Sequence, residues 1–208
     1  MTERLGIFGG AFDPVHVGHF EAINFIRGLE IIDDIQIIPN YLSPHKKETL
    51  ISSDHRLKML ELTFEDHKNI KFNDFEIKNK KKSFTLETLK FLKKIYPEKH
   101  FSLIIGSDSL YSFTSWQNWE QILSLSSLLV VGRKFDMKKK LNKTLKEKIT
   151  SNLEDFFSSS GKILLLENDL VDVSSSEIKK KIKKNEDLTG LVNKRVQEYI
   201  SIHSLYSN

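Results

Sequence analysis

The chain contains no cysteine, and only 4 of its 208 residues are proline. Without cysteine there is neither a disulfide framework nor a thiolate metal site. Apolar runs such as Leu128–Val131 and Ile163–Leu166 are far too short to span a bilayer. The N-terminus leads directly into an apolar segment and lacks the basic–apolar–cleavage pattern of a signal peptide. We therefore expect a soluble cytoplasmic protein that does not insert into a membrane.

The chain also has little excess charge, because 32 basic residues face 28 acidic ones and leave a formal net charge of +4. Such a surplus favours phosphorylated ligands but does not require a nucleic acid. Basic and aromatic residues do not alternate as in RNA-recognition modules, so we expect no nucleic-acid partner. The length suits one α/β domain, alone or with a small appendage.

Short apolar runs alternate with longer segments of helical periodicity. Because the runs are apolar on both faces, they predict buried strands, and strand alternating with helix predicts a doubly wound, mostly parallel sheet. The predicted strands are Leu5–Phe8, Ile35–Ile38, Phe101–Ile105, Leu128–Val131 and Ile163–Leu166. The predicted helices are Gly18–Leu29, Asp54–Phe64, Phe84–Ile95, Leu141–Phe157, Ser175–Lys184 and Val192–Ile200. We expect either Ser53 or Asp54 to cap the second helix.

Glycines follow three of the predicted strands directly, as Gly9-Gly10, Gly106 and Gly132. Ligands of doubly wound sheets bind beyond the carboxyl ends of the strands, so these glycines mark the expected binding edge. At Gly9-Gly10 the missing side chains allow backbone N–H groups to approach a phosphate closely. The sequence therefore places a candidate anion site after the first strand.

The segment GIFGGAFDPVHVGHF carries this site into the following helix. His16 and His19 are three residues apart and lie on one face of the first helical turn, where unpaired N–H donors and the helix dipole favour an anion. A solvated surface histidine is the ordinary alternative. Half of a zinc site is another, but the glutamate of a zinc-protease helix and a third ligand are both missing.

The combination GGxFDPxHxGH resembles the signature of the nucleotidyltransferase superfamily that shares the HxGH motif. Further along the chain come IIPNYLSPHKK, SFTLETL, FSLIIGSDSL, SWQNWEQIL, LLVVGR and VSSSEIKKKI. In this order they resemble the nicotinate-nucleotide adenylyltransferase family over essentially the whole chain. The resemblance implies a Rossmann-like nucleotidyltransferase fold in a single domain, residues 1–208, with a small C-terminal helical part at about 174–208.

The resemblance also implies roles for individual residues. Catalysis would rest on His16, His19 and Lys46. ATP would be bound by Gly9, Gly10, Phe12, His16, His19, Asp108, Arg133, Ser174, Ser175, Ser176 and Lys179. The mononucleotide would be bound by Asn40, His45, Lys46, Thr85 and Trp116. The chain departs from the family's usual ISSTxIR at Ser176 and Lys179, and it has Gln117 where relatives often carry a second aromatic residue.

The activity implied is transfer of the adenylyl group of ATP to nicotinate mononucleotide, as a step of NAD biosynthesis. Mg²⁺ would be the cofactor, held mainly by ATP phosphates and water, with no protein metal site. Alternatives are adenylylation of nicotinamide mononucleotide or phosphopantetheine, CMP transfer, and a non-catalytic nucleotide-binding protein. SFT and GSDSL–W argue against the phosphopantetheine and CMP enzymes, and the intact HxGH argues against a non-catalytic protein. The sequence leaves the oligomeric state open, a homo-oligomer included.

Overall fold

The computed structural model describes residues 2–43, 50–132, 135, 141–169 and 171–207. Across these residues, 7 strands form one sheet in the order β3-β2-β1-β4-β5-β7-β6, and every pair is parallel. The strands are β1 (Arg4–Gly10), β2 (Asp34–Pro39), β3 (Ile70–Phe72), β4 (His100–Gly106), β5 (Ser127–Gly132), β6 (Ile149–Thr150) and β7 (Ile163–Glu167). This confirms the predicted doubly wound parallel sheet. The sequence analysis missed β3 and β6, because these edge strands have only 3 and 2 residues and form no apolar run.

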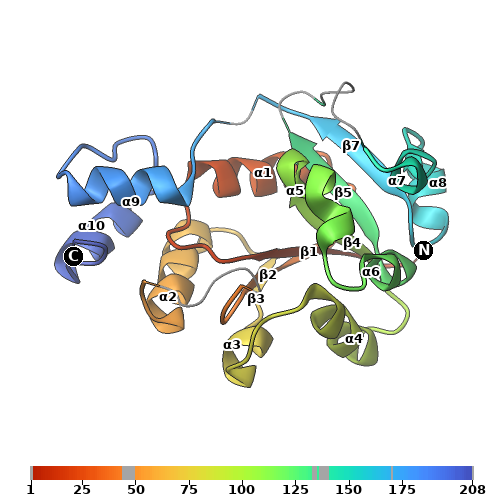
Figure 1. Ribbon diagram of the computed structural model, residues 1–208, viewed down its shortest axis with the longest axis horizontal. Helices are drawn as coiled ribbons and strands as arrows, with labels where there is room; N and C mark the ends of the chain where they lie inside the picture. The colour runs from red at the N-terminus through yellow and green to blue at the C-terminus, as the bar shows by residue number, and fades with distance from the viewer. Residues whose placement is uncertain (1, 44–49, 133–134, 136–140, 170, 208) are drawn as a thin grey trace.

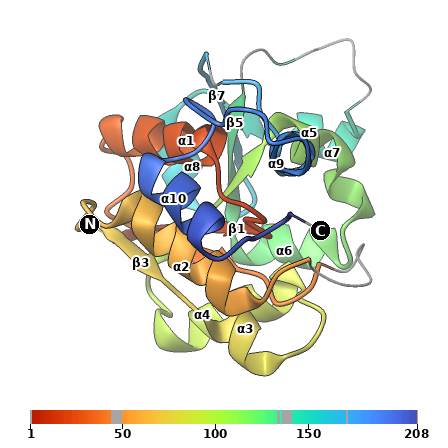
Figure 2. The same cartoon turned by 90° about the vertical axis from the view of Figure 1, so that its left-hand side faces the viewer.

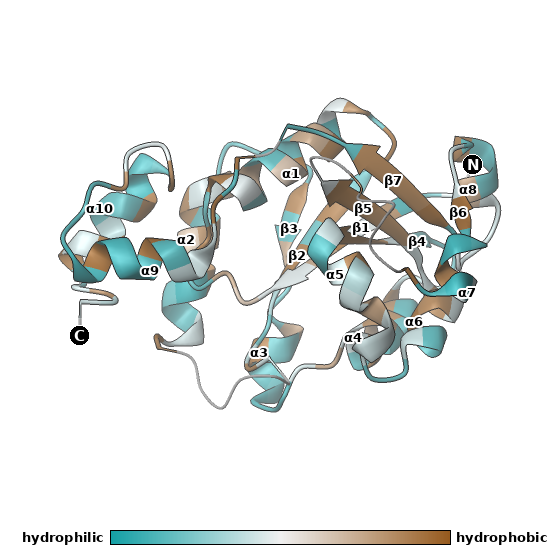
Figure 3. Ribbon diagram, turned by 45° about the horizontal axis from the view of Figure 1, so that its top comes forward, coloured by the Kyte–Doolittle hydropathy of each residue, from teal (hydrophilic) through white to brown (hydrophobic). Residues whose placement is uncertain are grey.

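The inner strands alternate between two hydrophobic cores, one on each face of the sheet. On β5, Leu129 and Val131 belong to the first core, whereas Leu128 and Val130 belong to the second. Alternate side chains of a strand point to opposite faces, so a strand that is buried on both sides must be apolar throughout. Figure 3 shows the resulting hydrophobic strands β1, β5 and β7 at the centre of the molecule.

Helices cover both faces (Figure 1). The first core includes residues of α1 (Val17–Gly28), α2 (Ser53–Phe64), α8 (Leu153–Ser158), α9 (Ser175–Lys183) and α10 (Lys194–Ile202). The second includes residues of α4 (Thr85–Ile95), α5 (Ser107–Ser112), the 3₁₀ helix η1 (Phe113–Ser115), α6 (Trp119–Leu125) and α7 (Lys143–Lys146), while α3 (Phe75–Asn79) lies beside β2. No helix of the described residues combines the length and apolarity that crossing a bilayer requires.

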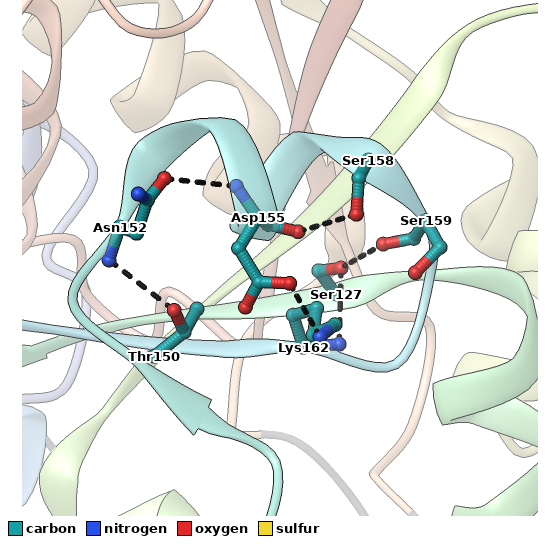
Figure 4. Close-up of polar contacts among 7 residues, drawn as sticks. All are labelled: Ser127, Thr150, Asn152, Asp155, Ser158, Ser159 and Lys162. Atoms are coloured by element: carbon teal, nitrogen blue, oxygen red, sulfur yellow. Dashed lines mark hydrogen bonds and ion pairs between the residues drawn. The ribbon is translucent and has the colours of Figure 1, made fainter.

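The predicted helix Leu141–Phe157 is wrong, because two asparagine caps divide this segment. The Asn142 side chain accepts a hydrogen bond from the Thr144 N–H at 2.8 Å and begins α7, and Asn152 does the same with the Asp155 N–H at 3.0 Å and begins α8. Figure 4 shows that Asp155 also accepts from the Lys162 ammonium at 2.6 Å, which ties α8 to the start of β7. Asparagine favours such cap positions over helix interiors.

Two other local predictions need correction. The cap of α2 is Ser52, whose hydroxyl accepts from the His55 N–H at 3.4 Å, and not Ser53 or Asp54. Four short helical segments, α3, α5, η1 and α6, were not predicted because none is long enough to show helical periodicity. At one end of the molecule α10 lies beside α2 (Figure 2), and Ile178 of α9 and Val196 and Ile200 of α10 join both C-terminal helices to the first core.

Candidate active site

The site lies at the point where the strand order reverses. From β1 the chain proceeds outward through β2 to β3, and β4 then returns to the other side of β1. Such a switch point leaves a crevice at the carboxyl ends of the two strands. Here the crevice is a cavity of about 1130 Å³, lined by Gly9 and Gly10 from β1 and by Gly106 from β4. A cavity of this size is at the upper end of those that bind cofactors and nucleotides.

The loop after β1 has little room for side chains. A Cβ atom on Gly10 would lie only 2.9 Å from the Phe12 ring, so this position requires glycine. Phe12 takes a positive φ of 47°, and its ring is only 1% exposed between Phe8 and His19. Gly9 and Gly10 line the cavity, whereas Phe12 lies in the core and does not line it.

His16 and His19 both line the cavity at the beginning of α1. Their rings lie 3.7 Å apart between centroids and are tilted by 32°. The backbone N–H of His16 donates to Nδ1 of His19 at 3.2 Å. In a neutral imidazole the other nitrogen then carries the proton, so Nε2 of His19 is a hydrogen-bond donor.

Enclosure keeps both histidines neutral. Burial lowers the pKa of His16 to about 4. The pKa of His19 is well below its ordinary value, first because of burial and second because of the neighbouring His16. An anion bound between them would reverse this preference, since an opposite charge favours the protonated imidazole. The pair is thus suited to receive negative charge.

Unsatisfied polar atoms mark the same wall of the cavity. Nδ1 of His16 and Oδ1 of Asn40 are buried, and neither finds a partner among the residues that the structure describes. The backbone holds Asn40 against the glycine loop, because its N–H donates to the Gly10 carbonyl at 2.9 Å. Buried polar atoms are nearly always paired in folded proteins, so these two are consistent with a polar ligand.

The opposite wall begins at the N-terminus of α4, where Thr85 is the first residue. Trp116 also lines the cavity and is partly buried. Its ring packs against that of Phe113, with 5.2 Å between the ring centroids. Glu76 of α3 lies in this wall and accepts a hydrogen bond from the Thr88 hydroxyl. Burial raises the pKa of the Glu76 carboxyl, and the hydroxyls of Thr88 and Ser83 partly oppose that rise.

Asp108 is exposed in the first turn of α5 and lines the cavity. Gly106 is the N-cap of this helix, so Asp108 does not cap it. It lies beyond the carboxyl end of β4, at the edge where ligands of doubly wound sheets bind.

The serines of VSSS lie outside the cavity lining. Ser174 caps α9 by accepting from the Glu177 N–H at 3.2 Å, and the Ser175 hydroxyl donates to the Pro14 carbonyl at 2.9 Å, while Ser176 is exposed. Lys179 lies one turn further along α9, and its ammonium contacts the Asp13 carboxylate at 3.0 Å. The structure thus brings α9 against the glycine loop through residues other than the cavity wall. His45, Lys46 and Arg133 fall outside the described residues.

Several lining residues were not among the predicted site residues. Ser107 and Ser109 belong to the GSDSL motif, so their motif could have indicated them. Glu76 precedes SFTLETL without any motif of its own, and Val171 and Val173 lie in the irregular segment before α9. Val173 is the first residue of the VSSSEIKKKI motif, whereas local sequence offers no signal for Glu76 and Val171, which the fold alone brings to the cavity.

The described residues contain no group of three or more histidine, aspartate or glutamate side chains able to hold a metal ion. Asp108 and Glu76 are the carboxylates of the described cavity lining, and Glu76 is already engaged with Thr88. This donor set fits a Mg²⁺ ion that keeps phosphate and water ligands, and it does not fit a protein cage.

Comparison with known proteins agrees with the geometry. The cytidylyltransferase-like family model matches residues 7–181. A Fusobacterium nucleatum protein named "Probable nicotinate-nucleotide adenylyltransferase" is 35% identical, over 95% of this chain and 96% of its own length. A Leptospira interrogans protein of the same name is also 35% identical, over 97% of this chain and 96% of its own.

A solved structure has the same fold. The nicotinic acid mononucleotide adenylyltransferase of Plasmodium falciparum, complexed with NaAD, superposes with a TM-score of 0.77 at 21% identity, covering 98% of this chain and 97% of that one. With a family model matching most of the chain and relatives matching nearly its full length, the chain belongs to the cytidylyltransferase-like family and, within it, to the nicotinate-nucleotide adenylyltransferases.

Proposed function

We propose that this protein transfers the adenylyl group of ATP to nicotinate mononucleotide, giving nicotinate adenine dinucleotide and pyrophosphate in NAD biosynthesis. The observation that carries the proposal is the pair of neutral, enclosed imidazoles at the start of α1, in a cavity large enough for two nucleotides. The names of relatives that match nearly the whole chain support the choice of substrates.

In this reaction an oxygen of the mononucleotide phosphate forms a bond to the α-phosphorus of ATP. The bond from that phosphorus to the bridging oxygen breaks, and pyrophosphate leaves with the electron pair. The nucleophile is already an anion, so no general base is needed. The protein must instead hold two anions together and stabilise the charge that develops around phosphorus. His19 donates to an α-phosphate oxygen from Nε2, the nitrogen that its contact with the His16 N–H leaves protonated.

The remaining roles follow the two walls of the cavity. Gly9 and Gly10 offer backbone N–H groups to the triphosphate, and Asp108 accepts from ribose hydroxyls. On the opposite wall Thr85 and Trp116 bind the pyridine ring and its carboxylate, and Asn40 binds the mononucleotide from the β2 side. The residues that we assign to substrates from their motifs alone are His45, Lys46, Arg133, Ser174, Ser175 and Ser176.

A Mg²⁺ ion bound with ATP would keep phosphate and water ligands, and Asp108, an exposed carboxylate of the described cavity lining, would meet its water shell. Bound there, the ion would neutralise part of the triphosphate charge. On the protein side, the backbone N–H groups of Gly9 and Gly10 and the two imidazoles would bind the remaining phosphate oxygens.

The experiment is pyrophosphate release from the purified full-length chain with Mg²⁺. ATP and CTP are each offered with nicotinate mononucleotide, nicotinamide mononucleotide and phosphopantetheine. We expect release with ATP and the nicotinate substrate, and little with the other pairs. Release with phosphopantetheine or with CTP would assign a sister enzyme, and no release with any pair would support a non-catalytic nucleotide-binding protein.

A further inference from the structure

A buried ion pair lies directly behind the loop that leads to the two histidines. The Asp13 carboxylate accepts from the Lys179 ammonium at 3.0 Å through one oxygen and from the Tyr206 hydroxyl at 2.9 Å through the other. The Asp13 and Lys179 side chains are only 3% and 15% exposed. Burial, and then the charge of Asp13, raise the pKa of the Tyr206 phenol, so it remains a proton donor.

A second buried cation supports the same loop from α2. Arg56 is fully buried, and its guanidinium donates to the Ala11 and Asn40 carbonyls, each at 2.6 Å. Arg56 therefore links the loop after β1 to the loop after β2. Together with Lys179 it gives the cluster two cations against the single carboxylate of Asp13. A surplus positive charge thus lies behind the segment proposed to bind the triphosphate.

Two further contacts join the C-terminal segment to this loop. The Ser175 hydroxyl donates to the Pro14 carbonyl at 2.9 Å, and the Val17 N–H donates to the Leu191 carbonyl at 2.9 Å. With the contacts of Lys179 and Tyr206 they all end on residues 13–17, immediately beside His16. The first turn of α9, which we propose to meet phosphate, is held by the same contacts.

We propose that Asp13 is a positioning residue for adenylyl transfer, which fixes the loop 11–17 on α9 and the C-terminal segment through Lys179 and Tyr206. The inference rests on the proposed function. Asp13 touches no substrate in this scheme, because it does not line the cavity. It sets the distance between the two imidazoles and the first turn of α9, and a misplacement of about 1 Å can cost roughly 10²-fold in rate. Lys179 is then engaged by Asp13 rather than by phosphate.

A purely structural role makes a different prediction. A buried ion pair is weak evidence for stability, and a pair that only supported the fold would change the unfolding midpoint and leave kcat of the folded protein unaltered. If Lys179 instead contacted a phosphate of ATP, replacing Lys179 would raise the KM for ATP. Tyr206 separates these cases, because its phenol is buried away from the cavity and cannot touch a phosphate.

The test compares matched substitutions in the full-length chain. Tyr206→Phe removes only the hydroxyl that meets Asp13, and Lys179→Met removes the paired ammonium. Their controls are Tyr199→Phe, whose hydroxyl contacts His55 of α2 at 2.8 Å, and Lys181→Met, whose ammonium pairs with Glu186 within the C-terminal segment at 3.1 Å. Steady-state kinetics with both substrates is measured on protein shown by circular dichroism to be folded at the assay temperature.

We expect kcat to fall roughly tenfold or more in Tyr206→Phe and in Lys179→Met, with the KM for the mononucleotide within about twofold of wild type. The two controls should keep wild-type kcat, and Lys179→Arg should recover most of the rate lost in Lys179→Met. A folded Tyr206→Phe protein with kcat within about twofold of wild type would overturn the inference, as would an equal loss in Tyr199→Phe. Wild-type protein that releases no pyrophosphate would instead refute the proposed function.

Discussion

The two walls of the cavity are held in different ways. The loop that precedes His16 is fixed by buried charges, since Asp13 meets Lys179 at 3.0 Å and the Arg56 guanidinium holds two backbone carbonyls. The wall that begins at Thr85 is held by hydroxyl groups around one partly buried carboxyl, Glu76, whose pKa is raised by its burial. The first wall therefore has a surplus of positive charge, and the second has none of comparable burial among the described residues.

This difference matches the two tasks of an adenylyl transfer. Negative charge develops on the oxygens around phosphorus, so the wall beside it benefits from cations and from imidazole N–H donors whose protonation a bound anion would favour. Selection of a ring substituent depends instead on donors and acceptors in fixed places. We therefore expect substitutions on the histidine wall to lower kcat and substitutions on the Thr85 wall to change KM and selectivity.

The largest expected effect is on the histidine wall. His19→Ala should lower kcat by on the order of 10²-fold or more while ATP still binds, because it removes a donor to the α-phosphate in the transition state. His55→Ala is the matched control, since His55 contacts Tyr199 and does not line the cavity. Near-normal turnover of folded His19→Ala would show that this wall does not serve the chemistry.

The next effect belongs to the Thr85 wall. Nicotinate mononucleotide should be preferred over the amide by between about 5- and 150-fold in kcat/KM, because an amide NH₂ would face backbone N–H donors and leave a buried group unpaired at a cost of about 1–3 kcal/mol. The measurement is kcat/KM for both mononucleotides at fixed ATP and Mg²⁺. Equal values would mean that this wall does not select the acid. Gln117 stands where relatives often carry a second aromatic residue, so a pyridine ring held less firmly there would lower the preference.

A smaller change, in the KM for the mononucleotide, should follow from removing the hydrogen bond between Thr88 and Glu76 in that wall. Thr88→Val keeps the shape of the side chain but removes the hydroxyl that donates to Glu76. We expect the KM for the mononucleotide to rise about 2- to 10-fold, with the KM for ATP unaltered, in line with the loss of one hydrogen bond. Thr63→Val is the control, because its hydroxyl donates to the Met59 carbonyl within α2 at 2.8 Å. A rise in the KM for ATP instead would break the division between the walls.

The last prediction concerns stability in acid and not catalysis. Burial lowers the pKa of His16 and of His100 to about 4, and the pKa of His19 is also well below its ordinary value. Between pH 6.5 and 4 the unfolded chain therefore binds more protons, so the free energy of unfolding falls as the pH drops, by up to about 1.4 kcal/mol per pH unit for each histidine.

His100 lies at the start of β4, away from the cavity lining, so His100→Phe isolates the contribution of the histidine wall. Urea unfolding at pH 7 and pH 5 should show a smaller pH difference in this variant than in wild type. The part that remains should shrink further when ATP is bound, because the anion favours the protonated imidazoles. An unchanged pH difference in His100→Phe would contradict the lowered pKa of that ring.

Most of the sheet could be predicted because its signals are local. The five apolar runs correspond to β1, β2, β4, β5 and β7, and the glycines after three of them lie at the edge where the cavity opens. His16 is the extended N-cap of α1 and not a residue of its first turn as predicted, yet its ring lies 3.7 Å from that of His19. The segment 141–157 could not be predicted in the same way. Its apolar residues suit one long helix, but Asn142 and Asn152 each cap the beginning of a separate short helix.

The sequence by itself determined the parallel sheet, the edge that carries the ligands and the family, since periodicity and motif order need only neighbouring residues. Only the tertiary structure decided that Tyr206 meets Asp13 across 193 positions, that Lys179 meets it across 166, and that Glu76 joins the Thr85 wall. The physical reason is that a buried charge or hydroxyl takes whichever partner the packing brings within about 3 Å, and no local pattern records that partner.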